Sequence, residues 1–230
     1  MKNTRDFFAI AAIAIGLTLP IKVVSAQGLP PGQLPELTGE WWQWALSIPA
    51  SVNPLTDATG DNCFVGQRGT TWFLAGVFFG GSATRACSIP ENTTLFFPAI
   101  NSVQINTPNV CGQGPDNLSV ADMEALNASV VNGASQILVE LDHKQVNVVR
   151  MRSPLFAVAL PPKNLFDAPC ASLGGAPAGI YSPAVADGLY AQVGPLTVGP
   201  HTLRIRSRNP TQAFAEDVTY NLTVVPVSLQ

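Results

Sequence analysis

Charged side chains are scarce in this chain of 230 residues. Only 12 % of the residues are Asp, Glu, Lys or Arg, and the 12 basic residues form no cluster. Nucleic acid is therefore disfavoured as a partner, because neutralising phosphates needs clustered Lys and Arg. Hydrophobic residues make up 47 % of the chain. That share is enough to bury a sizeable core, so the composition is not that of a disordered protein.

Histidine and the common catalytic motifs are also scarce. His143 and His201 are the two histidines, and the chain contains no GxSxG, HExxH, P-loop or GxGxxG pattern. Histidine is the usual acid or base at neutral pH, so hydrolysis through serine or zinc is disfavoured. His143 is expected at a hairpin tip and His201 at the start of a strand, where structural roles are favoured. The sequence therefore predicts no catalytic residue, no metal site and no cofactor.

Carboxylates leave one enzymatic alternative open. Retaining and inverting glycosidases need only two Asp or Glu side chains at a suitable separation. The carboxylates considered for such a pair are Asp57, Asp61, Asp142, Asp187, Glu216 and Asp217. Most of them lie beside Gly, Asn or other turn residues, where Asp ordinarily binds nearby backbone N–H groups. Turn roles are favoured, and a carboxylate-dependent polysaccharide hydrolase or lyase is the alternative.

The sequence has no apolar run long enough to span a bilayer. The apolar run over residues 7–19 follows Lys2 and Arg5 and precedes a small-residue cleavage site at residues 24–26. This pattern predicts a signal peptide over residues 1–26 and a secreted, periplasmic or extracellular protein. Its removal takes away three basic residues and one acidic residue, which leaves a net charge of −5. No membrane span is expected after cleavage.

Four cysteines follow the predicted cleavage site. An even count in an exported chain indicates two disulfides, and their spacing fits no CxxC zinc or redox pattern. Cys63 and Cys87 flank one apolar segment, whereas Cys111 and Cys170 lie in loops rich in Pro and Gly. The favoured pairing is therefore Cys63–Cys87 and Cys111–Cys170, out of three pairings that four cysteines allow.

The first structured element is expected to be a short helix. Residues 27–37 are rich in Pro and Gly and are expected to form an extended lead-in. Thr38 suits the N-cap of a helix that Pro49 ends. Trp41 and Trp44 share its apolar face, and Trp42 is expected to point elsewhere.

Most of the remaining chain has the pattern of strands. A second helix is expected over residues 119–132 with Ser119 as its cap, and a hairpin with its turn at residues 142–144. The predicted strands are residues 72–79, 94–100, 137–141, 146–149, 156–160, 188–196, 201–207 and 218–227. Pro98 makes the second of these an edge or irregular strand. Short strands at this spacing predict a mainly β fold: a single antiparallel β-sandwich domain over residues 38–230, Ig-like or jelly-roll-like, with one or two peripheral helices.

The stretch GQRGTTWFLAG, residues 66–76, offers a candidate ligand site. Gly66 and Gly69 favour a turn that projects Gln67 and Arg68. For Arg68 the favoured role is structural, as a side chain that satisfies loop carbonyls at a corner of the fold, and a ligand site is the alternative. Trp42 would add an aromatic surface of the kind that binds sugars. The candidate ligand-binding residues are therefore Trp42, Gln67 and Arg68.

Several stretches together resemble a family of secreted, mainly bacterial proteins with no established activity. These stretches are EWWQWALSIP, NCFVGQRGTTWFLAG, RACSIPENTTLFFPAIN and ADGLYAQVGPLTVGPHTLRIRS. The resemblance covers much of residues 38–208, and its closing hairpin is similar to Ig-like modules of exported proteins. It implies export and a sandwich, and it implies no catalytic residue.

Three functions fit these observations. The favoured one is a non-catalytic binding module for a glycan or another cell-surface component, because export and disulfides accompany an aromatic and polar cluster. The second is a structural or stress-related protein of the cell envelope, and the third is the carboxylate-dependent hydrolase or lyase.

Overall fold

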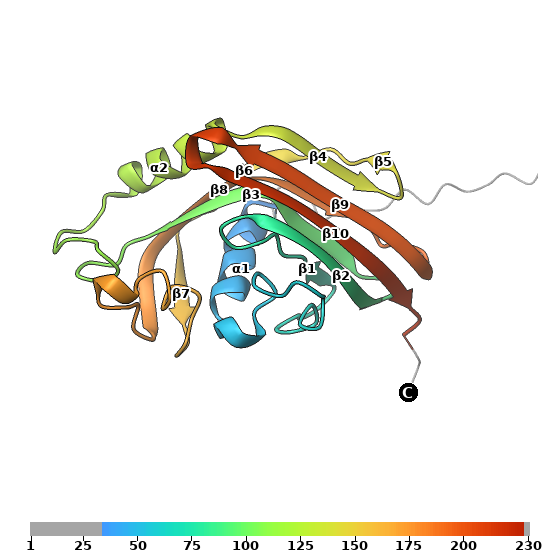
Figure 1. Ribbon diagram of the computed structural model, residues 1–230, viewed down its shortest axis with the longest axis horizontal. Helices are drawn as coiled ribbons and strands as arrows, with labels where there is room; N and C mark the ends of the chain where they lie inside the picture. The colour runs from blue at the N-terminus through green and yellow to red at the C-terminus, as the bar shows by residue number, and fades with distance from the viewer. Residues whose placement is uncertain (1–33, 228–230) are drawn as a thin grey trace, which may run out of the picture.

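The computed structural model describes residues 34–227, so the predicted signal peptide at 1–26 lies outside the described residues. Strands dominate this part of the chain (Figure 1). The helices are α1 (Leu34–Leu46), α2 (Val120–Asn132) and the short turns η2 (Ala50–Val52), η3 (Ala171–Leu173) and η4 (Pro210–Gln212). The strands are β1 (Thr71–Phe73), β2 (Gly81–Pro90), β3 (Thr94–Ile105), β4 (Ser135–Leu141), β5 (Lys144–Gln145), β6 (Val149–Arg152), β7 (Phe156–Leu160), β8 (Gly179–Val193), β9 (Gly199–Asn209) and β10 (Phe214–Val225).

The strands form two sheets. The first sheet has the order β1-β3-β8-β6, with β7 also paired to β8, and the second has the order β2-β10-β9-β4-β5. Most pairings are antiparallel, but β1–β3 and β2–β10 are parallel. The predicted mainly β sandwich is confirmed, and these two parallel pairs are the exceptions to its antiparallel arrangement. Because β2 and β10 are far apart in the sequence, no tight turn fixes their relative direction.

Two apolar cores give the molecule three layers. The core between the sheets contains Phe97 of the first sheet and Leu203, Val218 and Leu222 of the second. Helix α1 lies on the other face of the first sheet (Figure 1). Its tryptophans belong to one apolar cluster with Phe96 and Tyr190 of that sheet. A sheet with two apolar faces needs a cover on each side. The result is a mainly β sandwich with a helix on its outer face.

Several local predictions are confirmed. Helix α2 begins after Ser119, whose hydroxyl oxygen accepts a hydrogen bond from the Asp122 N–H at 3.1 Å. The hairpin turn falls at Asp142 and His143, which both have positive φ. Strand β3 is irregular between Pro98 and Ile100, beyond the three residues that pair with β1. Because Pro98 lies outside the segment that pairs with β1, its missing N–H costs no hydrogen bond to β1.

The start of the first helix was predicted wrongly. Helix α1 begins at Leu34, so the last four residues of the expected lead-in 27–37 are helical. Pro35 lies in the first turn, where a backbone N–H has no partner within the helix. Thr38 is not the cap, because its hydroxyl lies inside the helix and donates to the Pro35 carbonyl at 2.7 Å.

The strand predicted over residues 72–79 is also shorter than expected. It ends at Phe73 as β1, and the chain then leaves the sheet. The carbonyls of Ala75 and Gly76 accept hydrogen bonds from the Arg85 side chain, and Ala75 also from the Tyr220 hydroxyl, instead of from the backbone of a neighbouring strand. Strand β2, which carries Arg85, was missed. Its alternating burial places an arginine at an inward position where the pattern expects an apolar residue.

The disulfides join Cys63 to Cys87 and Cys111 to Cys170, with Cα atoms 6.1 and 5.0 Å apart. This is the pairing that the sequence favoured. The first disulfide ties the loop before β1 to β2, and the second ties the loop after β3 to the loop before β8. Within residues 34–227 no helix is long and apolar enough to cross a membrane.

Candidate functional site

The structure does not bring the three predicted ligand-binding residues together. Trp42 is only 6 % exposed and lines a cavity that opens to the surface. Arg68 is exposed and lines a separate groove of about 620 Å³ with Glu40 and Gln43. The helical pattern placed Trp42 away from the core, but α1 is covered on more than one side. Its ring packs edge-on against Trp41, with centroids 4.9 Å apart.

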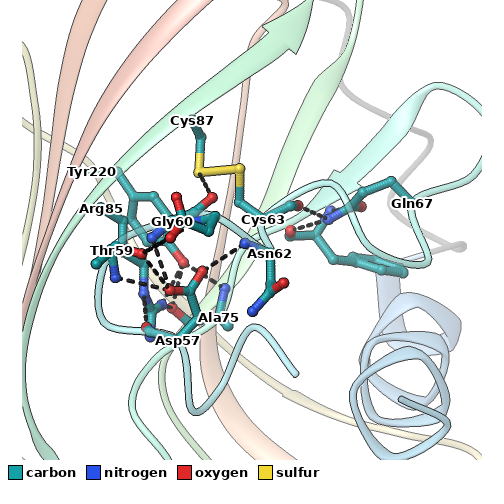
Figure 2. Close-up of a disulfide and its surroundings, with 12 residues drawn as sticks. Asp57, Thr59, Gly60, Asn62, Cys63, Gln67, Ala75, Arg85, Cys87 and Tyr220 are labelled. Carbon is teal, nitrogen blue, oxygen red and sulfur yellow. Dashed lines mark hydrogen bonds between the residues drawn. A yellow bond between two sulfur atoms is a disulfide. The ribbon is translucent and has the colours of Figure 1, made fainter. Parts of the chain in front are cut away.

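Gln67 holds the turn in place instead of presenting an open amide. Its Nε2 donates to the carbonyls of Cys63 and Phe73, and its Oε1 accepts from the Phe73 N–H (Figure 2). These three bonds, 2.8 to 3.0 Å long, use its amide as a bridge between the turn and β1. Gln67 is therefore a structural residue in this arrangement.

The arginine that ties down a corner of the fold is Arg85. Its side chain is 1 % exposed and donates to the carbonyls of Asp57, Ala75 and Gly76 and to the Tyr220 hydroxyl (Figure 2). These bonds hold the loop before β1 and the segment after it against β2 and β10. A guanidinium with several donors satisfies buried carbonyls that would otherwise be unpaired.

A cavity of about 320 Å³ lies beside this corner. Its lining comes from helix α1, the segment after β1, the irregular part of β3, the end of α2 and the start of β10. Its walls are mostly apolar and aromatic, with a few polar groups. The lining residues that carry the argument below are Trp42, Gly76, Phe78, Phe79, Phe214 and Glu216.

Glu216 is the ionisable residue in this lining. It is 7 % exposed; its Oε1 accepts from the Ser207 hydroxyl at 3.0 Å and its Oε2 from the Val77 N–H at 3.2 Å. Burial raises the pKa of Glu216 to about 7, because removal from water disfavours the charged form. The two hydrogen bonds and the positive charge of Arg85 offset this effect only in part.

Gly76 makes room for the Glu216 carboxyl. A Cβ atom at residue 76 would lie 2.5 Å from the Glu216 Oε2. Real carbon and oxygen atoms do not approach so closely, so any larger residue would displace the carboxyl group. The last glycine of the stretch GQRGTTWFLAG therefore shapes the cavity.

Aromatic rings form the rest of the wall. Phe78 and Phe79 lie side by side with ring centroids 4.2 Å apart, and Phe79 is 70 % exposed. Phe214 comes from the start of β10. The Trp42 indole also borders this space, and its buried Nε1–H lies close to the Tyr190 hydroxyl.

The other carboxylates considered from the sequence have structural roles. Asp57 accepts from the N–H groups of Thr59, Gly60 and Asn62. Asp142 lies 2.7 Å from His201, and Asp187 is paired with two arginines of β6. Of the residues that line the cavity, Glu216 alone is acidic. The two-carboxylate arrangement of a glycosidase is therefore not assembled around it.

Glu216 was considered from the sequence only as one carboxylate of a pair, although its place in the last strand carries a further signal. Val218, Tyr220 and Leu222 were predicted on one face of the last strand, and Glu216 has the same parity. An acidic residue in an inward row of apolar residues is unusual enough to mark a site.

Among residues 34–227, no three His, Cys, Asp or Glu side chains come together as a metal site. Comparisons of the chain with family models, curated proteins and solved structures found no match.

Proposed function

We propose that the protein is an exported binding protein whose cavity recognises the end of a glycan or another small cell-surface component. The observation that carries this proposal is the cavity itself, which combines aromatic walls with a buried carboxyl group. Its volume of about 320 Å³ falls at the lower end of the range of ligand pockets. Such a volume suits one sugar ring better than a long polymer.

Binding fits this cavity better than hydrolysis does. Sugar rings have apolar faces that stack on aromatic side chains and hydroxyl groups that bind carboxyl and amide groups. Phe79 offers an exposed ring at the mouth, and Asn101 and Gln212 add polar groups to the wall. A glycosidase needs two carboxylates, whereas the lining of this cavity contains a single one, Glu216.

Export is supported by two independent features. The first is the signal-peptide pattern of residues 1–26. The second is the pair of disulfides, because such bonds persist in oxidising compartments outside the cytosol. Both agree with a protein that meets its ligand at or beyond the cell surface.

A titration with a panel of mono- and oligosaccharides tests the proposal. We expect at least one of them to bind. Phe79→Ala should weaken that binding by roughly tenfold, because stacking of a flat group on an aromatic side chain contributes about 1–3 kcal/mol. Arg68→Ala, in the separate groove, is the matched control and should bind normally. Loss of binding in Arg68→Ala with normal binding in Phe79→Ala would move the site to the groove. No binding of any saccharide would favour an envelope protein with a structural role.

A further inference from the structure

The cavity contains one unbalanced charge. None of its lining residues is basic, and Glu216 is its one ionisable residue. The nearest buried cation is Arg85, but its guanidinium donates to three backbone carbonyls and to Tyr220, not to the carboxylate. An ionised carboxylate inside a protein is unfavourable unless a cation pairs with it. Glu216 therefore lacks the direct partner that its ionised form needs.

The neighbours of Glu216 do not supply this partner. Ser207 on β9 and Val77 after β1 provide neutral donors. On the same strand, Asp217 lies on the opposite face and pairs with Arg204 and Arg206. The positive charge must therefore come either from a proton or from a ligand.

The aromatic rings of the wall suit a positively charged ligand as well. Trp42, Phe78, Phe79 and Phe214 come from three different segments and border the same space as Glu216. The face of an aromatic ring attracts a cation, and several rings around one carboxylate form a common site for ammonium groups. An anionic ligand would instead meet the Glu216 charge without a basic residue to offset it.

We infer that the cavity binds an organic cation, with the ammonium group of the ligand between the Glu216 carboxylate and the aromatic rings. This inference rests on the proposed function and narrows it. If the ligand is the end of a glycan, the end is an amino sugar with a free amine. If it is a smaller cell-surface component, it carries an alkylammonium group.

Two matched pairs of probes test the charge requirement. Choline and 3,3-dimethylbutan-1-ol have the same shape and differ in the positive nitrogen. Chitosan trisaccharide and its fully N-acetylated form differ in the free amines. Calorimetric titration of the oxidised chain at several pH values around neutrality covers conditions in which the Glu216 carboxyl is ionised and the ligand amine keeps its proton. We expect the charged member of at least one pair to bind tenfold or more tightly than its neutral partner.

Variants locate the effect in the cavity. Glu216→Gln keeps the shape and removes the charge, so the preference for the charged probe should disappear while the neutral probe binds as before. Phe79→Ala changes an exposed ring and leaves the buried carboxyl in place, so it tests the inference even if Glu216→Gln does not fold. It should weaken the charged probe more than the neutral one. Arg68→Ala should change neither.

The outcomes separate the inference from the proposed function. Preference for both charged probes indicates ammonium recognition in general, and preference for the trisaccharide alone indicates an amino sugar. Equal binding within both pairs, or a preference that survives Glu216→Gln, overturns the inference and leaves the binding function standing. If the saccharide panel and all four probes fail to bind, the inference and the proposed function fall together.

Discussion

At the residue scale, Gly76 and Glu216 form a contact that leaves no room for a side chain. Gly76 has an ordinary φ, so its role is space and not backbone conformation. We expect Gly76→Ala to displace the carboxyl and to lower the free energy of unfolding by about 1–3 kcal/mol, as overpacking does. Gly114→Ala is the control, because a Cβ there meets nothing within 4 Å. Urea denaturation of both variants measures the difference, and equal stability would contradict the close contact.

The raised pKa of Glu216 predicts a pH dependence. Between pH 4.5 and about 7 the folded protein keeps a proton that the unfolded chain has released. The free energy of unfolding should therefore fall as the pH rises through this window. Glu216→Gln removes this contribution, so its stability relative to the natural protein should rise by about 3 kcal/mol between pH 4 and pH 8. Denaturant titrations across this range measure it, and parallel pH profiles would show that Glu216 titrates as an exposed carboxyl.

At the scale of elements, Arg85 joins segments that have no ladder between them. It connects the loop at Asp57 and the segment at Ala75 and Gly76 to β2 and β10 (Figure 2). We expect Arg85→Met to lower the free energy of unfolding by about 3–5 kcal/mol, because it leaves several buried carbonyls without donors. Arg208→Met, an exposed position on β9, should have little effect. Similar stability of the two variants by thermal or chemical melts would argue against this role.

The helices and strands differ in how accurately the sequence predicted them. The α2 cap at Ser119 and the turn at Asp142 depend on residues within a few positions, so local patterns were enough. Strand β2 was missed because Arg85 interrupts its inward row, and the partners that make an inward arginine stable lie on other segments.

At the scale of the whole molecule, the disulfides join segments that no strand pairing connects: the loop before β1 to β2, and the loop after β3 to the loop before β8. The bonds span 24 and 59 residues. By the loss of chain entropy in the unfolded state, the first should stabilise the fold by about 3 kcal/mol and the second by about 4 kcal/mol. The paired replacement Cys111→Ala, Cys170→Ala should therefore destabilise more than Cys63→Ala, Cys87→Ala. Urea denaturation of both under non-reducing conditions measures the order, and the reverse order would mean that folded-state effects outweigh loop entropy.

The sequence by itself determined the β-rich class, the α2 cap, the hairpin turn and the cysteine pairing. These follow from side-chain period, local hydrogen bonding and composition, which act over short distances along the chain. Tertiary structure alone decided the parallel pairing of β2 with β10, the burial of Trp42 and the cavity around Glu216. The Val77 N–H that binds Glu216 lies 139 positions away from it, and Gly76 beside it makes the necessary space. The ionisation and the shape of that site depend on which distant segments the fold packs against one carboxyl group.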